Sequence, residues 1–273
     1  MRFLYLSLLV TSCAIAAPQP IDDLSLIRGF ERDLGKHAEH GEFPDVASLI
    51  DQLEKAPDQI EMPDMPHQSV PNPIDAVYLV GSVYKCGRCD QWHAGGVATA
   101  WALTADGLMI TNHHVFANAK GGAMGVTDRH GQCHPVEAVL AADPNADLAI
   151  FRVRAAKLNT LVLGPDAAIG TQVRVIGHPG RHLFMQTSGE VARYSIRRSK
   201  ENPQGSIWMS ITADYAKGSS GGPVIDPEGR VVGVVCSTQS IHSDDTEGKR
   251  GPLQMVVKNC IPVSSLRAML SAD

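Results

Sequence analysis

Gly218-Ser219-Ser220-Gly221-Gly222-Pro223 is a glycine-rich segment with a serine at its centre, set between two strand-like stretches. Hydrolysis of an acyl bond by a serine needs its hydroxyl, a neutral imidazole that accepts the proton, a carboxylate that fixes the imidazole tautomer, and backbone N–H groups for the oxyanion. Glycines let the backbone turn sharply and approach a substrate carbonyl. We therefore expect Ser220 to be a nucleophile, with the N–H groups of Gly218 and Ser220 as oxyanion hole. Taken alone, the segment could equally be a hairpin turn.

Two other segments offer the partners that such a serine needs. Thr111-Asn112-His113-His114-Val115 ends a predicted strand and presents two imidazoles. Asp147 follows a turn and enters an apolar stretch, where a buried carboxylate needs a donor such as an imidazole N–H. Each segment alone has an ordinary structural interpretation, as a surface or core histidine and as an aspartate that finishes a turn.

In combination, the three segments resemble the motifs of trypsin-like serine proteases, specifically of the bacterial HtrA-like branch. That family takes its base from Thr-Asn-x-His-Val, its carboxylate from Asp-x-Ala and its nucleophile from Gly-x-Ser-Gly-Gly-Pro. Here they follow in the same order, with Asp147 33 residues after His114 and Ser220 73 residues after Asp147. The family histidine directly precedes the valine, which selects His114 and leaves His113 replaceable. The resemblance extends from about residue 95 through residue 237.

The resemblance implies an all-β fold of two packed six-stranded antiparallel barrels with the site in the cleft between them. It also implies a serine endopeptidase that hydrolyses peptide bonds in proteins through an acyl-enzyme intermediate, with protein or peptide substrates as partners. We expect no cofactor, no catalytic metal and no PDZ domain. The alternative is a catalytically silent protease fold that serves as a binding or chaperone-like scaffold, with its site held inactive by the segment at 17–75 acting as a pro-region.

Three residues near Ser220 bear on substrate preference. Asp214 precedes Ser220 by six positions, where trypsin has the base of its side-chain pocket, so the resemblance suggests cleavage after Lys or Arg. A local pair between Asp214 and Lys217 would remove this preference. By the same resemblance, Cys236 and Ser237 are expected to line the pocket and to hydrogen-bond the substrate backbone by strand addition.

Hydrophobic periodicity divides the chain into a helical beginning and a strand-rich remainder. Apolar residues at 24, 27, 30 and 34 and at 46, 49, 50 and 53 predict two short amphipathic helices, the second capped by Asp45 and ended by Pro57. A last helical pattern covers 264–270. Between them, short β-rich runs separated by turn signals favour a sandwich or a pair of barrels. These runs are 97–103, 108–115, 136–142, 148–154, 171–176, 190–196, 207–213, 223–225, 231–235 and 253–257.

Charge and proline content indicate a boundary near residue 75. Residues 17–75 hold 4 Lys and Arg against 13 Asp and Glu, a net charge of −9, whereas residues 76–273 have a net charge of +3. Prolines at 57, 63, 66, 71 and 73 predict an extended linker. We expect a signal peptide at 1–16, an acidic helical segment with a linker at 17–75, and the protease domain at 76–273. The acidic segment could lie against the rest of the protein or be a solvated arm, and we favour the arm. A net charge of +3 with one short basic run at 197–200 is too small for a nucleic-acid site.

The first residues have the pattern of an export signal. Arg2 precedes an apolar run, and Ala14-Ile15-Ala16 provides a small-x-small cleavage site, so we expect cleavage after Ala16 and a periplasmic or secreted protein. No stretch is long enough to span a bilayer as a permanent helix. Val10-Thr11-Ser12-Cys13 also resembles a bacterial lipobox, in which Cys13 would carry a lipid anchor.

Five cysteines remain once the signal is removed, and the odd number leaves at least one of them free, metal-bound or paired between chains. Cys86-Gly87-Arg88-Cys89 has three open interpretations. It could form a short disulfide, which we favour, provide half of a zinc site with Cys133 and His134 or His93, or be a redox motif. The aspartate that follows excludes a haem attachment site.

Overall fold

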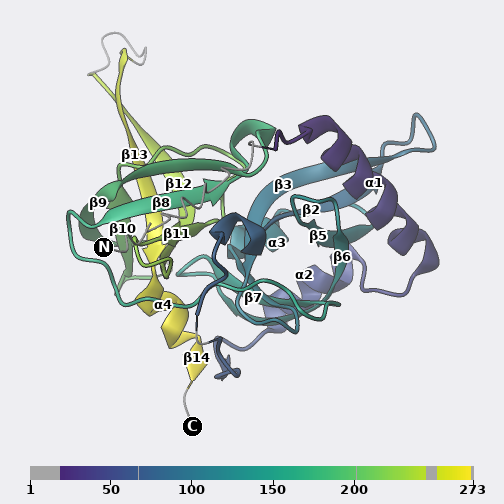
Figure 1. Cartoon of the computed structure of the whole chain (residues 1–273), viewed down its shortest axis with the longest axis horizontal. Coiled ribbons are helices and arrows are strands. Elements are labelled where there is room, and N and C mark those ends of the chain that lie inside the picture. Colours follow the sequence, from purple (N-terminus) through teal and green to yellow (C-terminus); the bar gives the residue numbers. More distant parts are fainter. Residues whose placement is uncertain (1–18, 67, 201, 244–250, 272–273) are drawn as a thin grey trace, which may run out of the picture.

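Two closed barrels of six antiparallel strands each form the framework of the molecule (Figure 1). The computed structural model describes residues 19–66, 68–200, 202–243 and 251–271. The expected signal peptide, including Cys13, lies outside these residues. The all-β fold of two six-stranded barrels that the sequence predicts is confirmed.

The first half of the strand-rich region forms one barrel and the second half forms the other. The strand-rich region therefore passes from the first barrel to the second once, between β7 and β8. Around the first barrel the strand order is β2 (Val77–Lys85), β3 (Trp92–Ala102), β4 (Leu108–Thr111), β7 (Leu148–Val153), β6 (Cys133–Asp143) and β5 (Ala123–Thr127). Around the second it is β10 (Ser206–Ile211), β13 (Leu253–Pro262), β12 (Val231–His242), β11 (Pro223–Ile225), β8 (Gln172–Gly177) and β9 (Met185–Arg197).

Strand β2, one of two barrel strands that the sequence analysis missed, has no polar face. Its residues from Val77 to Val83 are all buried, because α1 covers the outside of the barrel there. A strand buried on both faces lacks the alternation on which the prediction relies. The other missed strand, β5, is short and also buried throughout. The run predicted at 108–115 was too long, since β4 ends at Thr111 and α3 (His113–Ala117) begins two residues later.

The two N-terminal helices confirm the helical periodicity but not the solvated arm. In α1 (Asp23–His40) the side chains of Phe30 and Leu34 are fully buried against β2 and β5, and in α2 (Val46–Lys55) that of Leu49 is fully buried in the same barrel. Asp45 caps α2 as expected, since it accepts the N–H of Ser48 at 2.8 Å. The apolar face of each helix packs on the barrel and is shielded from water. The helices of the acidic segment therefore form an outer layer on the first barrel.

The segment after α2 also lies on the protein. β1 (Ile60–Glu61) pairs in parallel with β14 (Leu270–Ser271), which follows the C-terminal helix α4 (Val263–Ala268). A short 3-10 helix, η1 (Pro73–Ala76), then leads into β2, and a second one, η2 (Pro179–Arg181), follows β8. The proline-rich stretch is extended, as predicted, but its two ends are tied down. No helix in the described part of the chain is long and apolar enough to cross a membrane.

Candidate active site

His114 and Asp147 form a two-point contact at the edge of the first barrel. Oδ1 of Asp147 accepts the backbone N–H of His114 at 2.9 Å, and Oδ2 lies 2.7 Å from Nδ1 of the same residue. An ionised carboxylate can only accept, so the proton of the neutral imidazole is on Nδ1 and Nε2 is left as a base. The ring of His114 is 39% exposed and the carboxylate 20%.

Asn112 holds Asp147 in an unusual backbone conformation. Asp147 has a φ of 57°, a left-handed value that few residues other than glycine, asparagine and aspartate adopt. The side-chain amide of Asn112, which is fully buried, donates to the carbonyl of Asp147 at 2.9 Å. The sequence analysis quoted Asn112 as part of a motif and gave it no role. The structure shows that it connects the segment of His114 directly to that of Asp147.

Cys236 supplies another donor to the carboxylate. Its Sγ lies 3.1 Å from Oδ2 of Asp147, so the thiol completes a set of three donors around that side chain. Burial raises the pKa of the Cys236 thiol, so that it stays protonated and donates. Cys236 was predicted to line the substrate pocket, and it lines a cavity beside Ser220. The contact with Asp147 was missed, because nothing in the sequence brings two residues so far apart together.

The segment around Ser220 belongs to the second barrel but is held by the first. The hydroxyl of Thr99, on β3, donates to the carbonyl of Gly218 at 2.9 Å, and the N–H of Thr99 donates to the carbonyl of Ser220 at 2.8 Å. Both Thr99 contacts cross between the barrels. A Cβ at Gly218, whose φ is 105°, would collide with the carbonyl oxygen of His178. This close approach and the positive φ explain why glycine is needed at 218.

Ser220 and His114 face one cavity without a hydrogen bond between them. A cavity of about 290 Å³ is lined by both residues together with Lys217, Gly218 and parts of β2 and β3. Oγ of Ser220 donates to the carbonyl of Cys236 at 3.3 Å. Among the described residues no contact between this Oγ and Nε2 of His114 is close enough to be a hydrogen bond. A change of the serine χ1 angle is the movement that would redirect the hydroxyl.

The carbonyl of Lys217 points away from the cleft. It accepts the N–H of Gly180 at 2.8 Å. In a trans peptide the C=O and the following N–H point in opposite directions, so the N–H of Gly218 faces away from Gly180. Within the described ranges, neither this N–H nor that of Ser220 donates to another group of the protein. Both therefore keep their hydrogen-bonding capacity for another group.

A second cavity, of about 190 Å³, adjoins Ser220 on the other side. Its lining is Tyr215, Ala216, Lys217, Ser220, Val235, Cys236, Ser237 and Thr238, which includes both predicted backbone-binding residues. Asp214 is absent from this lining. Its side chain is 85% exposed and lies 3.2 Å from Nζ of Lys258. Asp214 thus pairs on the surface with Lys258, neither at the base of the pocket nor with Lys217, and the geometry gives no support to a carboxylate that would bind Lys or Arg.

His178 is a buried imidazole directly behind the serine loop. Burial lowers the pKa of His178 to about 4. Its Nδ1 accepts the N–H of Phe184 at 2.9 Å, so this nitrogen carries no proton in the folded protein. The sequence analysis gave His178 no role. Its position between a strand and a Pro-Gly turn was the only signal, and that position does not reveal burial.

The comparisons with known proteins agree with this fold. Residues 98–234, half of the chain, match the trypsin-like peptidase domain family, and the chain belongs to that family. A probable periplasmic serine endoprotease DegP-like of Pseudomonas fluorescens is 27% identical over 72% of this chain and 44% of its own length. The serine protease Rv3671c of Mycobacterium tuberculosis is 34% identical over 54% of this chain and 37% of its own length.

Solved structures show the same architecture. The inactive form of the Rv3671c protease superimposes with a TM-score of 0.55 at 23% identity, over 72% of this chain and 88% of that one. The HtrA-type protease AlgW with a decapeptide gives a TM-score of 0.56 at 19% identity, over 72% and 63%. At these identities the likeness concerns the fold. The chain spans less than half the length of the curated relatives described above.

Proposed function

We propose that this chain is a serine endopeptidase, with Ser220 as nucleophile, His114 as general base and Asp147 as the residue that orients His114. The observation that carries the proposal is the two-point contact between Asp147 and His114, which leaves Nε2 of the imidazole unprotonated beside the cavity that Ser220 also lines. A structural role would not need a histidine oriented in this way.

The chemistry follows from these positions. Nε2 of His114 takes the hydroxyl proton while Oγ of Ser220 bonds to the scissile carbonyl carbon, and the carbonyl oxygen becomes an oxyanion that the N–H groups of Gly218 and Ser220 bind. His114 then gives the proton to the leaving amine, which leaves an acyl group on Ser220. Water deprotonated by His114 hydrolyses this ester and restores the serine. The carboxylate of Asp147 stabilises the imidazolium in both halves.

Labelling with a fluorophosphonate tests the nucleophile. The unmodified chain should take up one probe molecule, and Ser220→Ala should take up none. Ser240→Ala is the matched control, because Ser240 is an exposed serine on β12 of the same barrel. Equal labelling of Ser220→Ala and the unmodified chain would exclude Ser220 as the nucleophile.

A silent scaffold has one observation in its favour, which is the hydroxyl of Ser220 turned toward the carbonyl of Cys236. The idea that the acidic segment blocks the site finds no support, since the residues that line the two cavities come from β2 and from parts of the chain after it. No labelling of the unmodified chain, together with no hydrolysis of unfolded protein substrates, would favour the scaffold.

For the substrate side chain before the scissile bond, we propose a small uncharged group in place of Lys or Arg. The cavity of about 190 Å³ has no acidic side chain in its described lining and contains Lys217. Tyr215 limits the size of this cavity, because its hydroxyl donates to the carbonyl of Asn259 at 2.7 Å and so holds the ring in place. A cation there would lose its hydration without a partner. Peptides matched except for Arg, Ala or Val at this position measure the preference, and faster cleavage after Arg would contradict it.

We also propose a periplasmic or secreted location, with the peptidase domain at 76–273 preceded by a helical segment and a signal. The relative from P. fluorescens is named as periplasmic, and residues 1–16 have the composition of a signal. Mass spectrometry of the protein from its host would find Ala17 at the N-terminus. A lipid-modified Cys13 at that position would show the anchored form instead.

A further inference from the structure

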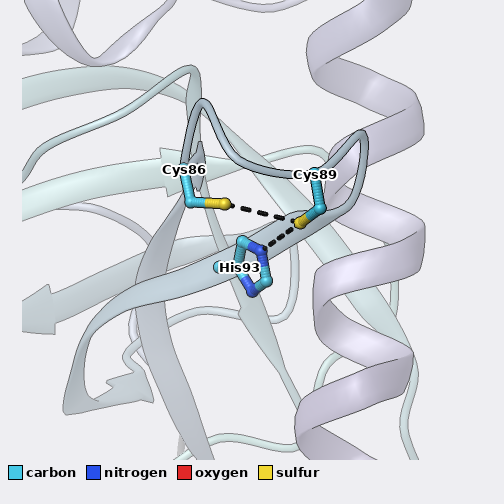
Figure 2. Close-up of side chains that lie close together, drawn as sticks. All are labelled: Cys86, Cys89 and His93. Carbon is cyan, nitrogen blue, oxygen red and sulfur yellow. Dashed lines mark hydrogen bonds between the residues drawn. The ribbon is translucent and has the colours of Figure 1, made fainter.

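Cys86, Cys89 and His93 lie together at the tip of the β2–β3 hairpin (Figure 2). Cys86 directly follows the last residue of β2, Cys89 is three residues further on in the connecting loop, and His93 is the second residue of β3. Sγ of Cys86 is 3.4 Å from Sγ of Cys89, which is 3.1 Å from Nε2 of His93. All three atoms lie within 4.8 Å of one another.

From this arrangement we propose that the hairpin tip binds one thiophilic divalent cation of the zinc class through Sγ of Cys86, Sγ of Cys89 and Nε2 of His93. A water molecule would take the fourth position. This site is separate from the proposed peptidase site and does not depend on it.

The distances are close to those that a tetrahedral ion requires. With metal–sulfur bonds of about 2.3 Å and metal–nitrogen bonds of about 2.0 Å, tetrahedral geometry places two sulfurs about 3.8 Å apart and a sulfur and a nitrogen about 3.5 Å apart. The observed separations are shorter by about 0.4 Å, so small rotations of the side chains would admit the ion. The thiolate and imidazole donors suit zinc and do not suit magnesium or calcium.

The loop backbone brings the two sulfurs together. Gly87 has a φ of 73°, which turns the chain back so that Cys89 returns to Cys86. As ligands, two thiolates and a neutral imidazole would balance the charge of a divalent ion.

His93 is the observation that favours a metal over a disulfide. A disulfide between Cys86 and Cys89 would need no third group, yet Nε2 of His93 is directed at Cys89. The structure contains no bond between the two sulfurs. Cys133 and His134, considered as ligands on the sequence, do not belong to the cluster. Both lie on β6 beside β5, and among the described residues only Cys86, Cys89 and His93 form such a group.

The strands below the loop are held firmly. Nζ of Lys85 donates to the carbonyl of Asp90 at 2.9 Å across the loop, and the indole N–H of Trp92 donates to Glu39 of α1 at 2.9 Å. An ion at the tip would therefore fasten the end of a hairpin whose lower part, around Gly81 and Val97, forms a wall of the cavity beside Ser220.

Cobalt titration of the full chain tests the site without any measurement of activity. The protein would carry Ser220→Ala against self-digestion, and would be reduced, freed of metal and titrated with Co²⁺ without air. A sulfur-to-cobalt charge-transfer band and visible bands should grow to one equivalent and disappear when one equivalent of Zn²⁺ is added. Cys86→Ser and Cys89→Ser should each weaken the charge-transfer band, and the double variant Cys86→Ser/Cys89→Ser should lose it. His93→Ala should bind Co²⁺ at least about tenfold more weakly.

Cys133→Ser is the matched control, because it also removes one cysteine from the first barrel but lies outside the cluster, and it should bind like the parent. Native mass spectrometry of the parent should find one Zn²⁺ per chain, a result that does not depend on how the variants fold. A parent chain without a charge-transfer band would overturn the proposal. So would a band that persists in the double variant, or a protein whose Cys86 and Cys89 are joined as a disulfide when isolated.

Discussion

The two halves of the candidate active site are prepared to different degrees. On the first barrel, the carboxylate of Asp147 has three donors and the imidazole of His114 is fixed in one tautomer. On the second barrel, the loop of Ser220 is held at its carbonyls by Thr99, but the serine hydroxyl bonds to a backbone carbonyl and the N–H groups of Gly218 and Ser220 have no described partner. The proposed base is thus oriented by the protein alone, whereas the proposed nucleophile and oxyanion hole retain hydrogen-bonding groups for a substrate.

This difference indicates where mutations act. Changes at Asp147 should impair the proton transfer, with little effect on how substrate binds. Changes behind the serine loop should act on the position of the nucleophile or on the stability of the second barrel.

The largest effect is expected from Asp147→Asn, which disrupts the contact between residue 147 and His114 on the first barrel. Asparagine tolerates the left-handed backbone at 147 but donates through its amide, so it favours the tautomer of His114 whose Nε2 is protonated. A loss of about 10⁴-fold in kcat, with KM nearly unchanged, is expected near neutral pH. His113→Gln, next to the base, should retain most of the activity. A loss below about tenfold for Asp147→Asn would remove Asp147 from its proposed role.

The next effect concerns acid stability and His178 behind the serine loop. The folded-state pKa of His178, about 4, lies below the ordinary value of 6.5. Between these pH values His178 is therefore protonated in the unfolded chain but not in the folded protein. Stability is therefore complete above about pH 6.5 and decreases as the pH falls toward 4. Between pH 7 and pH 5 this residue should cost about 2 kcal/mol of unfolding free energy.

Urea unfolding of the unmodified chain and of His178→Gln at both pH values measures this loss. Glutamine keeps an acceptor for the N–H of Phe184 but does not titrate. The variant should therefore lose less stability than the parent on acidification, and an equal loss in both would show that His178 does not set the acid limit.

A smaller effect is expected from Thr99→Val, which loosens the serine loop. Valine has the shape of threonine but leaves the carbonyl of Gly218 without its donor. One lost hydrogen bond to a buried group costs about 1–3 kcal/mol, so we expect kcat/KM to fall by about ten- to one-hundredfold. Thr99→Ser retains the hydroxyl and should restore most of the rate. If both variants lose activity equally, packing of the methyl group would be the cause.

Cys236 should give the smallest effect, because it is only one of three donors to Asp147. Cys236→Ser keeps a donor at this position and should change kcat by less than about threefold, whereas Cys236→Ala should reduce it by about threefold to tenfold. Rates of peptide hydrolysis distinguish the two. A larger loss in the serine variant than in the alanine variant would contradict the role of the thiol as a donor.

The sequence predicted the elements whose pattern is local and missed contacts that only the fold creates. Helical periodicity located both N-terminal helices, and the Asp45 cap was found from one residue type before an apolar run. β2 was missed because burial on both faces removes its alternation. The docking of α1 was the less favoured of two interpretations of the charge difference, and its apolar stripe does not by itself show which surface buries it.

For the site, the motifs brought His114, Asp147 and Ser220 together as candidates before their geometry was known. The support from Thr99 and Cys236 comes from side chains on other strands, and that from Asn112 depends on a contact with the carbonyl of Asp147, so no spacing in the sequence reveals it. Asp214 is the opposite case. A position counted from Ser220 suggested a pocket base, but the loop carries this aspartate outward to Lys258.

The N-terminal helices precede every strand that they cover, and this has a consequence for biosynthesis. α1 and α2 are made first, yet the surfaces that bury Phe30 and Leu49 are completed only when β5 and β6 have been synthesised. Until then the apolar faces of α1 and α2 are exposed to water and to other nascent chains. A chaperone that shields the first sixty residues would therefore improve the yield of folded protein more than one that acts on the finished chain.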